Sequence, residues 1–268
     1  MRGGLATPRA FSVLAPNPGP MTLDGTNTWL LQEPGSDTVA VVDPGPDQRD
    51  HWQAVAREVE RRGARIDTIL LTHRHGDHSA GADLFARETG CGVRAWDPEL
   101  ATDSEPLVDG EIVVAGGCEV TVVASPGHSS DSVCFWVSAD RALLTGDTIL
   151  GRGTTVVAFP DGNLEQYLAT LDQLQQMAAD GRVGTILSGH GPLVTDPLAV
   201  VGFYLDHRAE RLEQVRVAAA DLTSQGSTEL AEEDLAALIV EQVYADVPRI
   251  VWPAALLSVR SQLEYLRR

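Results

Sequence analysis

Short runs of β-branched and other apolar residues alternate with amphipathic stretches along most of the chain. Residues 39–42 are apolar without interruption, and residues 66–72 are rich in β-branched and aliphatic side chains, so both runs predict buried strands. Residues 49–62 repeat apolar side chains at helical spacing and precede Gly63, a residue that commonly ends a helix. This alternation predicts a mixed α/β structure built in layers.

The same patterns predict further elements down the chain. The predicted strands are residues 93–96, 119–125, 132–137, 141–145 and 184–188. The predicted helices are residues 79–89, ended by Gly90, and residues 164–179, capped by Asn163. Because the strands fall on either side of residues 104–110, they allow two related sheets.

After residue 190 the pattern becomes helical. Residues 198–222 and 230–268 have helical spacing, and the polar residues 223–228 separate them. We therefore divide the chain into a catalytic domain, residues 1–208, and a C-terminal helical module, residues 209–268.

Composition narrows the function classes. The chain has 268 residues, 43% of them hydrophobic, and only three widely spaced cysteines, so we expect a core without disulfides. No apolar run approaches the roughly 20 residues of a membrane span, and the N-terminal residues lack the apolar core of a signal peptide. We expect a soluble cytoplasmic protein with no membrane contact.

The chain is strongly acidic, with a formal net charge of −18, and such a charge repels polyanions on average. From Glu210 onward, ten acidic residues outnumber six arginines. This balance argues against DNA binding by the helical module. We expect the module to serve in packing, in the substrate cleft or in forming a homodimer.

The most informative residues follow the predicted strand 66–72. His73 and His75 are two positions apart, so in an extended chain their imidazoles leave on the same side and can share one cation. Asp77 and His78 can turn toward a second cation. A structural reason for such a cluster is hard to find, because the imidazoles would repel when protonated and would each need a buried partner when neutral.

Three more residues of metal-ligand type each follow a predicted strand and a small-residue turn: His128, Asp147 and His190. Ligands at strand ends converge on one edge of a sheet, where a cleft can form. The seven residues divide between two cations, with His73, His75 and His128 on the first, Asp77, His78 and His190 on the second, and Asp147 able to bridge them. Each cation keeps an open position, as catalytic metal sites do.

An open position beside two cations indicates hydrolysis. A hydroxide that bridges two divalent cations forms near neutral pH, and the cations stabilise the developing oxyanion. We expect zinc, while manganese or iron would also suit these ligands. Asp77 and Asp147 are the candidate catalytic carboxylates, and the expected substrate is a small molecule with an ester, thioester or phosphodiester bond.

At these residues the sequence resembles the metallo-β-lactamase superfamily. The HxHxDH motif of that family stands here at residues 73–78, and its supporting motifs stand at residues 126–128, 145–148 and 188–191. The resemblance implies a four-layer αββα sandwich with a dinuclear site at one edge of the two sheets. It also implies that Asp43 supports a ligand or the loop after His73, although an ordinary turn before Pro44 would explain Asp43 as well.

Residues 25–29, 127–132 and 146–151 are similar to the beta-lactamase-like protein 2 branch, which is known for endoribonuclease activity, and to the hydroxyacylglutathione hydrolases. This likeness implies a winged-helix-like C-terminal module and makes single-stranded RNA an alternative substrate. The acidic charge instead favours a small ester or thioester. A non-hydrolytic, iron-binding redox scaffold is the alternative of a different class.

Five other residues have weaker claims to a role. Arg152 and Ser129 lie in or just after ligand loops and are candidates for substrate binding. Arg74 could meet an anionic substrate group or serve as a structural salt-bridge partner. His51 and His207 lie on predicted helices away from any strand end, so we expect them on the surface or in helix packing.

Overall fold

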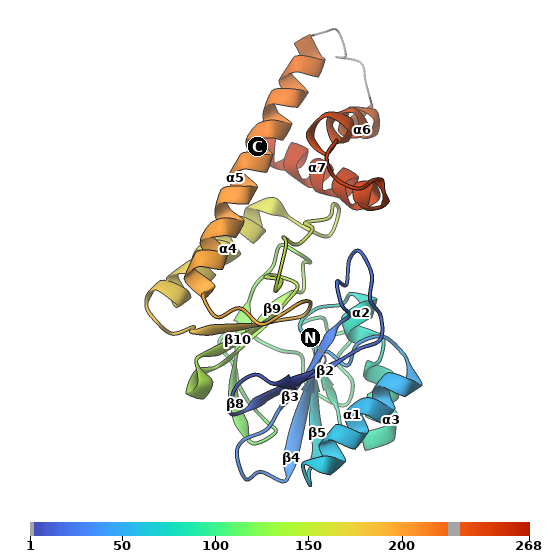
Figure 1. Ribbon diagram of the computed structural model, residues 1–268, viewed down its shortest axis with the longest axis vertical. Coiled ribbons are helices and arrows are strands. Elements are labelled where there is room, and N and C mark those ends of the chain that lie inside the picture. Colours follow the sequence, from blue (N-terminus) through green and yellow to red (C-terminus); the bar gives the residue numbers. More distant parts are fainter. Residues whose placement is uncertain (1–2, 225–230) are drawn as a thin grey trace.

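Two packed β-sheets form the centre of the protein in a computed structural model that describes residues 3–224 and 231–268 (Figure 1). The first sheet has the strand order β1-β2-β3-β4-β5-β6 and the second has the order β11-β10-β9-β8-β7. The strands of the first sheet are β1 (Gly4–Leu5), β2 (Ala10–Leu14), β3 (Asn27–Leu31), β4 (Thr38–Val42), β5 (Arg65–Leu70) and β6 (Val93–Arg94). Those of the second are β7 (Ile112–Ala115), β8 (Cys118–Ala124), β9 (Val133–Val137), β10 (Ala142–Gly146) and β11 (Thr185–Ser188).

Both sheets are mixed. The strands β4, β5 and β6 are parallel, as are β10 and β11, whereas the other neighbouring pairs are antiparallel. The residues at 104–110 lie between the two sheets in the sequence, so the two predicted groups of strands correspond to the two sheets. Their facing sides meet in a core that includes Leu31, Val42, Phe135 and Leu144.

Helices cover the two outer faces. The helices are α1 (Arg49–Arg61), α2 (Gly76–Ser79), α3 (Ala82–Thr89), α4 (Leu164–Ala179), α5 (Pro197–Ser224), α6 (Glu232–Val243) and α7 (Trp252–Leu266), with short 3₁₀ turns at Ser138–Asp140 and Arg249–Val251. Helices α1 and α3 pack on the first sheet through Val55 and Phe85, and α4 and α5 pack on the second through Leu171 and Tyr204. These four layers confirm the expected αββα sandwich.

Local chemistry explains where two helices begin and end. The Asn163 side chain accepts a hydrogen bond from the Gln166 amide (3.0 Å), so α4 begins after its predicted cap and covers residues 164–179 as expected. The predicted helix 79–89 is shorter in the structure, because α3 begins only at Ala82 and Ser79 is the last residue of the separate turn α2. The break between α2 and α3 falls beside Gly81, which packs so closely on the 44–46 loop that a Cβ there would lie 3.1 Å from its carbonyl oxygens.

The long helix α5 projects away from the sandwich, and the C-terminal helices α6 and α7 pack against α5 (Figure 1). An apolar cluster that includes Val215, Ile239 and Val259 joins the three helices. Residue 208 lies inside α5, so the predicted boundary falls within a continuous helix and the division into two domains stays a prediction. Within residues 231–268 the structure has helices and no strand, so this described part of the module contains no wing hairpin.

Three smaller expectations concern the rest of the chain. Thr223 and Ser224 end α5, and the remainder of the predicted polar linker lies outside the described residues. The three cysteines are free thiols. In the described part of the chain, no helix is both long enough and apolar enough to cross a membrane.

Candidate metal centre

The seven predicted ligands meet at one edge of the two sheets. Four of them follow β5 of the first sheet, and three follow β8, β10 and β11 of the second. Their ligand atoms fall into two sets, and within each set all atoms lie within 4.8 Å of one another. One set is His73, His75 and His128, and the other is Asp77, His78, Asp147 and His190.

Asp147 faces both sets. Its Oδ1 lies 3.3 Å from His78 Nε2, and its Oδ2 lies 3.8 Å from His128 Nε2. The two nearest nitrogens of the first set, His128 Nε2 and His75 Nδ1, are 3.0 Å apart. Asp77 completes the second set, because its Oδ2 lies 3.1 Å from His190 Nε2.

Hydrogen bonds outside the cluster orient three of the imidazoles. In each, Nδ1–H donates to an oxygen behind the cluster, which leaves the lone pair of Nε2 directed inward. These pairs are His78 with Asp43 Oδ2 (2.8 Å), His128 with the Val156 carbonyl (2.7 Å) and His190 with the Gly25 carbonyl (3.2 Å).

Among the described residues, His73 Nε2 is a buried ligand atom without a hydrogen-bond partner, and Asp147 Oδ1 has only longer contacts to imidazole nitrogens, 3.3 Å to His78 and 3.4 Å to His190. Buried polar atoms without partners are costly, and facing lone pairs are costly for the same reason. A pair of divalent cations among these nitrogens and oxygens would satisfy all of them. The donor set therefore fits two cations of the zinc, manganese or iron type.

Protonation differs between the two sets. Burial lowers the pKa of His73 well below its usual value and lowers the pKa of His128 to about 4. Burial acts in the same direction on His190, but the neighbouring carboxylates of Asp147 and Asp77 outweigh it and raise the pKa of His190 to about 9. His73 and His128 therefore offer neutral imidazoles near neutral pH, whereas a cation that binds to His190 has to displace a proton.

Asp43 supports the centre from behind. It is 1% exposed, and its carboxylate accepts hydrogen bonds from the Thr72 amide (2.8 Å), the Thr72 hydroxyl (2.7 Å) and His78 Nδ1 (2.8 Å). A single carboxylate thus holds one candidate ligand and the end of the strand before His73. Its backbone has a φ of 54°, in the left-handed region, which turns the chain sharply after β4.

His51 lies one step further from the centre, in the packing of α1. Its Nε2–H donates to the Thr28 hydroxyl (2.8 Å), which in turn donates to the Asp43 carbonyl (2.7 Å). His51 is fully buried and belongs to neither ligand set. It therefore lies in helix packing, as expected.

The burial of His51 makes stability depend on pH. Burial lowers the pKa of His51 to about 4, so the folded protein holds the neutral ring while the unfolded chain takes up a proton below its ordinary value near 6.5. The stabilisation that comes from keeping His51 neutral is therefore fully present above pH 6.5 and is lost as the pH falls toward 4. Between pH 7 and 4.5 we expect the wild type to lose about 2 kcal/mol more unfolding free energy than His51→Gln. Urea unfolding of both proteins at the two pH values tests this, and equal losses would contradict it.

A cavity of about 470 Å³ opens next to the ligands. His75, Asp77, His128 and Asp147 line it, while the other three ligands lie behind them. Its further walls come from the 150–158 loop, from α5 and from the residues that lead into α7. The candidate metals would therefore lie at one end of a cavity that the C-terminal helices help to enclose.

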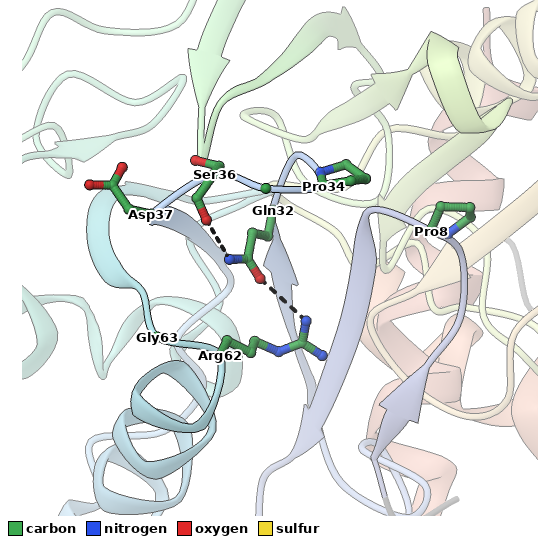
Figure 2. Close-up of a pocket in the computed structure, with 8 residues that line it drawn as sticks. Pro8, Gln32, Pro34, Ser36, Asp37, Arg62 and Gly63 are labelled. Carbon is green, nitrogen blue, oxygen red and sulfur yellow. Dashed lines mark hydrogen bonds between the residues drawn. The ribbon is translucent and has the colours of Figure 1, made fainter.

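Figure 2 shows a separate cavity, of about 570 Å³, between the β3–β4 turn and the end of α1. The Gln32 amide donates to the Ser36 carbonyl (2.9 Å) and accepts from Arg62 (3.4 Å), so its polar groups bond to one another. Its lining contains one carboxylate, Asp37, and no histidine or cysteine. None of the candidate metal ligands lies in it, so we place the candidate active site in the cavity beside the ligands.

The other candidates lie in different surroundings. Arg152 lines the ligand cavity, but its guanidinium is paired with Asp24 (2.6 Å). The Ser129 hydroxyl is buried and donates to Asp131 (2.8 Å), away from the cavity lining. Arg74 pairs with Asp97 (2.9 Å), which is the structural alternative for that residue.

It was not predicted from the sequence that two residues of α5 line the cavity. His207 was expected on the surface or in helix packing, and Arg208 was not considered, yet both line the cavity from α5. The available signal was the basic run His207, Arg208 and Arg211 in an otherwise acidic C-terminal region.

Comparison with known proteins places this fold and site in a family. The profile of the metallo-beta-lactamase superfamily matches residues 21–190. The chain is 32% identical over 261 residues to a beta-lactamase-like protein 2 homolog from Caenorhabditis elegans, covering 95% of this chain and 82% of the relative. It is 33% identical over 227 residues to an atrochrysone carboxyl ACP thioesterase from Aspergillus fumigatus, covering 83% and 68%. A beta-lactamase domain protein from Burkholderia ambifaria shares the fold, with a TM-score of 0.78, 23% identity and coverage of 99% and 87%.

An αββα sandwich with clustered histidines and aspartates at its edge defines a class of metal-binding hydrolases. The chain belongs to the metallo-beta-lactamase superfamily, as its sequence resemblance implied. It is a hydrolase of that superfamily, and its His/Asp cluster is suited to divalent metals.

Proposed function

We propose that the protein is a thioesterase that uses two divalent cations, held by the two ligand sets. The observation that carries the proposal is the pair of ligand sets, with a buried partnerless nitrogen, at the end of an enclosed cavity. When bound, the two cations supply a hydroxide nucleophile near neutral pH and positive charge for the developing oxyanion. Zinc is the expected metal, and manganese and iron are the alternatives.

The protein side chains have three tasks in this chemistry. Asp147, between the two sets, would hold both cations at a fixed separation. Asp77 lines the cavity, and although burial opposes it, the hydrogen bond from His190 lowers the pKa of Asp77, so the carboxylate is ionised and can accept a proton from the attacking water. The cavity walls hold the acyl group while water adds to its carbonyl carbon and the thiol leaves.

Two observations favour a thioester over the other bonds. A relative that covers most of this chain is named a thioesterase. The cavity is also lined largely by apolar and small side chains such as Leu150, Val251 and Leu257, which suit an acyl group better than a polyanion.

Chelation together with one ligand variant tests the proposal. Removal of metal, or His75→Ala, is expected to reduce thioester hydrolysis by about a thousandfold, because the metals account for several kcal/mol of transition-state stabilisation. Added zinc or manganese should restore the chelated wild type and fail to restore the variant. Thioester turnover that survives both treatments would refute the proposal.

The same assay includes the two alternatives. Labelled single-stranded RNA, tested beside the thioesters, should remain uncut, since the described C-terminal helices carry a net negative charge. Elemental analysis of the isolated protein separates zinc from iron. Metal-dependent RNA cleavage without thioester turnover would favour the nuclease, and iron with neither hydrolytic activity would favour a redox scaffold.

A further inference from the structure

Arg208 is a buried cation in the wall of the ligand cavity. It lies on α5, is 8% exposed and stacks over the Tyr167 ring at 5.2 Å. One guanidinium nitrogen donates to the Thr155 carbonyl and the Tyr167 side chain is a further polar neighbour, while the buried Nε has no hydrogen-bond partner among the described residues. A buried guanidinium needs further acceptors to offset the loss of water.

No carboxylate of the described residues serves as an acceptor for the Arg208 guanidinium. Neither Arg208 nor its neighbour Arg211 forms an ion pair with any residue of the described chain, whereas Arg216, on the same helix, pairs with Glu213. Arg211 instead donates to the Val243 carbonyl (2.7 Å) and stacks on Tyr244. Two guanidinium groups thus have no counter-ion among the described residues, in a chain whose net charge is −18.

The surrounding cavity wall strengthens this local positive charge. His207 and Arg211 are four residues apart, so they share one face of α5, and both line the cavity. The buried His207 Nδ1 has no partner among the described residues. Of the described carboxylates, Asp77 and Asp147 alone line this cavity, and both belong to the ligand sets.

This positive wall lies close to the reacting centre. The Thr155 carbonyl accepts from Arg208, and the Thr155 hydroxyl lies 3.1 Å from Nδ1 of the ligand His128. An anionic group bound to Arg208 would therefore lie in the same cavity as a scissile carbonyl placed beside the ligands. A phosphate on the thiol side of a long carrier arm would be much further from that carbonyl.

We propose that the substrate is a thioester whose acyl group ends in a carboxylate, and that Arg208, assisted by His207 and Arg211, binds this carboxylate. The inference rests on the proposed thioesterase function and specifies its substrate class. Ala254, Ala255 and Leu257, which lie in the first half of α7, provide an apolar wall for the methylene groups between the two ends of such an acyl group.

Matched thioesters test the substrate class. Glutaryl and succinyl thioesters of N-acetylcysteamine carry the carboxylate without any phosphate, and their monomethyl esters remove its charge. We expect the wild type to prefer the free acids in kcat/KM by at least tenfold. Arg208→Met should reduce kcat/KM on the free acids by roughly 30-fold, mainly through KM, and leave the methyl esters almost unchanged.

Three further variants separate binding from structure. Arg208→Lys should keep part of the preference, and Arg211→Met should reduce it. Arg216→Met, an exposed arginine of the same helix, should behave as the wild type. An Arg208→Met protein that loses activity equally on acids and methyl esters would overturn the inference in favour of a structural role at the Thr155 loop.

A binding measurement is independent of turnover. Glutarate should raise the melting temperature of the chelated wild type and of Arg216→Met, but not that of Arg208→Met. If preference appears only with coenzyme A thioesters and follows their phosphates, the carboxylate assignment is wrong. Turnover of neutral thioesters without any carboxylate preference overturns this inference alone, whereas no turnover on any thioester overturns the proposed function.

Discussion

Replacing Asp147 with asparagine is expected to lower thioester hydrolysis by about a thousandfold and to reduce the bound metal to one ion or fewer per chain. Asp147 is the one carboxylate that faces both ligand sets, with an oxygen 3.3 Å from His78 on one side and 3.8 Å from His128 on the other. Asparagine keeps the shape but loses the negative charge that would hold two cations together. Elemental analysis and the thioester assay measure the two effects on the same preparation.

The control for this variant is Asp172→Asn, on the exposed face of α4, which removes the same charge far from the centre. It should retain both metals and full activity. An Asp147→Asn protein with two ions per chain and normal turnover would show that Asp147 does not link the two sets.

Removing Asp43 should affect both metal affinity and stability. Asp43→Ala takes away three buried hydrogen bonds and leaves the Thr72 hydroxyl and His78 Nδ1 without their acceptor. We expect metal affinity to fall by about 10- to 100-fold, as for other outer carboxylates that hold a metal-binding histidine. We also expect unfolding free energy to fall by about 3 kcal/mol, because buried polar groups lose their partner.

Metal titration against a competing chelator and urea unfolding of the metal-free protein measure these two losses separately. Asp47→Ala, in the exposed part of the following loop, should change neither. If Asp43→Ala keeps the metal affinity of the wild type, Asp43 serves only the turn after β4.

The ligand cluster could be predicted from sequence because its information is local. Each ligand follows a strand and a short turn, so the pattern specifies which side chains lie at the same sheet edge. Helix α4 was predictable for a similar reason, since its cap at Asn163 and its apolar spacing agree. In both cases neighbouring residues carry the whole signal.

Strand β3 was missed because its burial depends on distant residues. Asn27 is a polar residue at the start of a fully buried strand, and apolar patterning passes over it. Its side-chain amide donates to the carbonyls of Ser188 (3.1 Å) and Gly191 (2.9 Å), which lie 161 and 164 residues further along the chain. Only the packed sandwich reveals that a polar side chain is satisfied there.

Arg208 was missed for a related reason. Helical spacing states which residues share a face of α5, but not which face turns toward the ligands. That direction depends on where α5 crosses the 150–158 loop, a contact between segments about fifty residues apart. The proposed substrate class therefore depends on the structure, whereas the candidate metal ligands could be predicted from the sequence.

Each ligand set contains residues that follow strands of both sheets, so neither half of the chain contains a complete set. The first combines two residues after β5 with His128, and the second combines two residues after β5 with Asp147 and His190. A cation bound by a complete set would therefore contact both halves of the chain. Its affinity would be thermodynamically linked to the packing of one sheet on the other. A fragment carrying one sheet alone would lack a complete ligand set and should bind divalent cations more weakly than the whole chain.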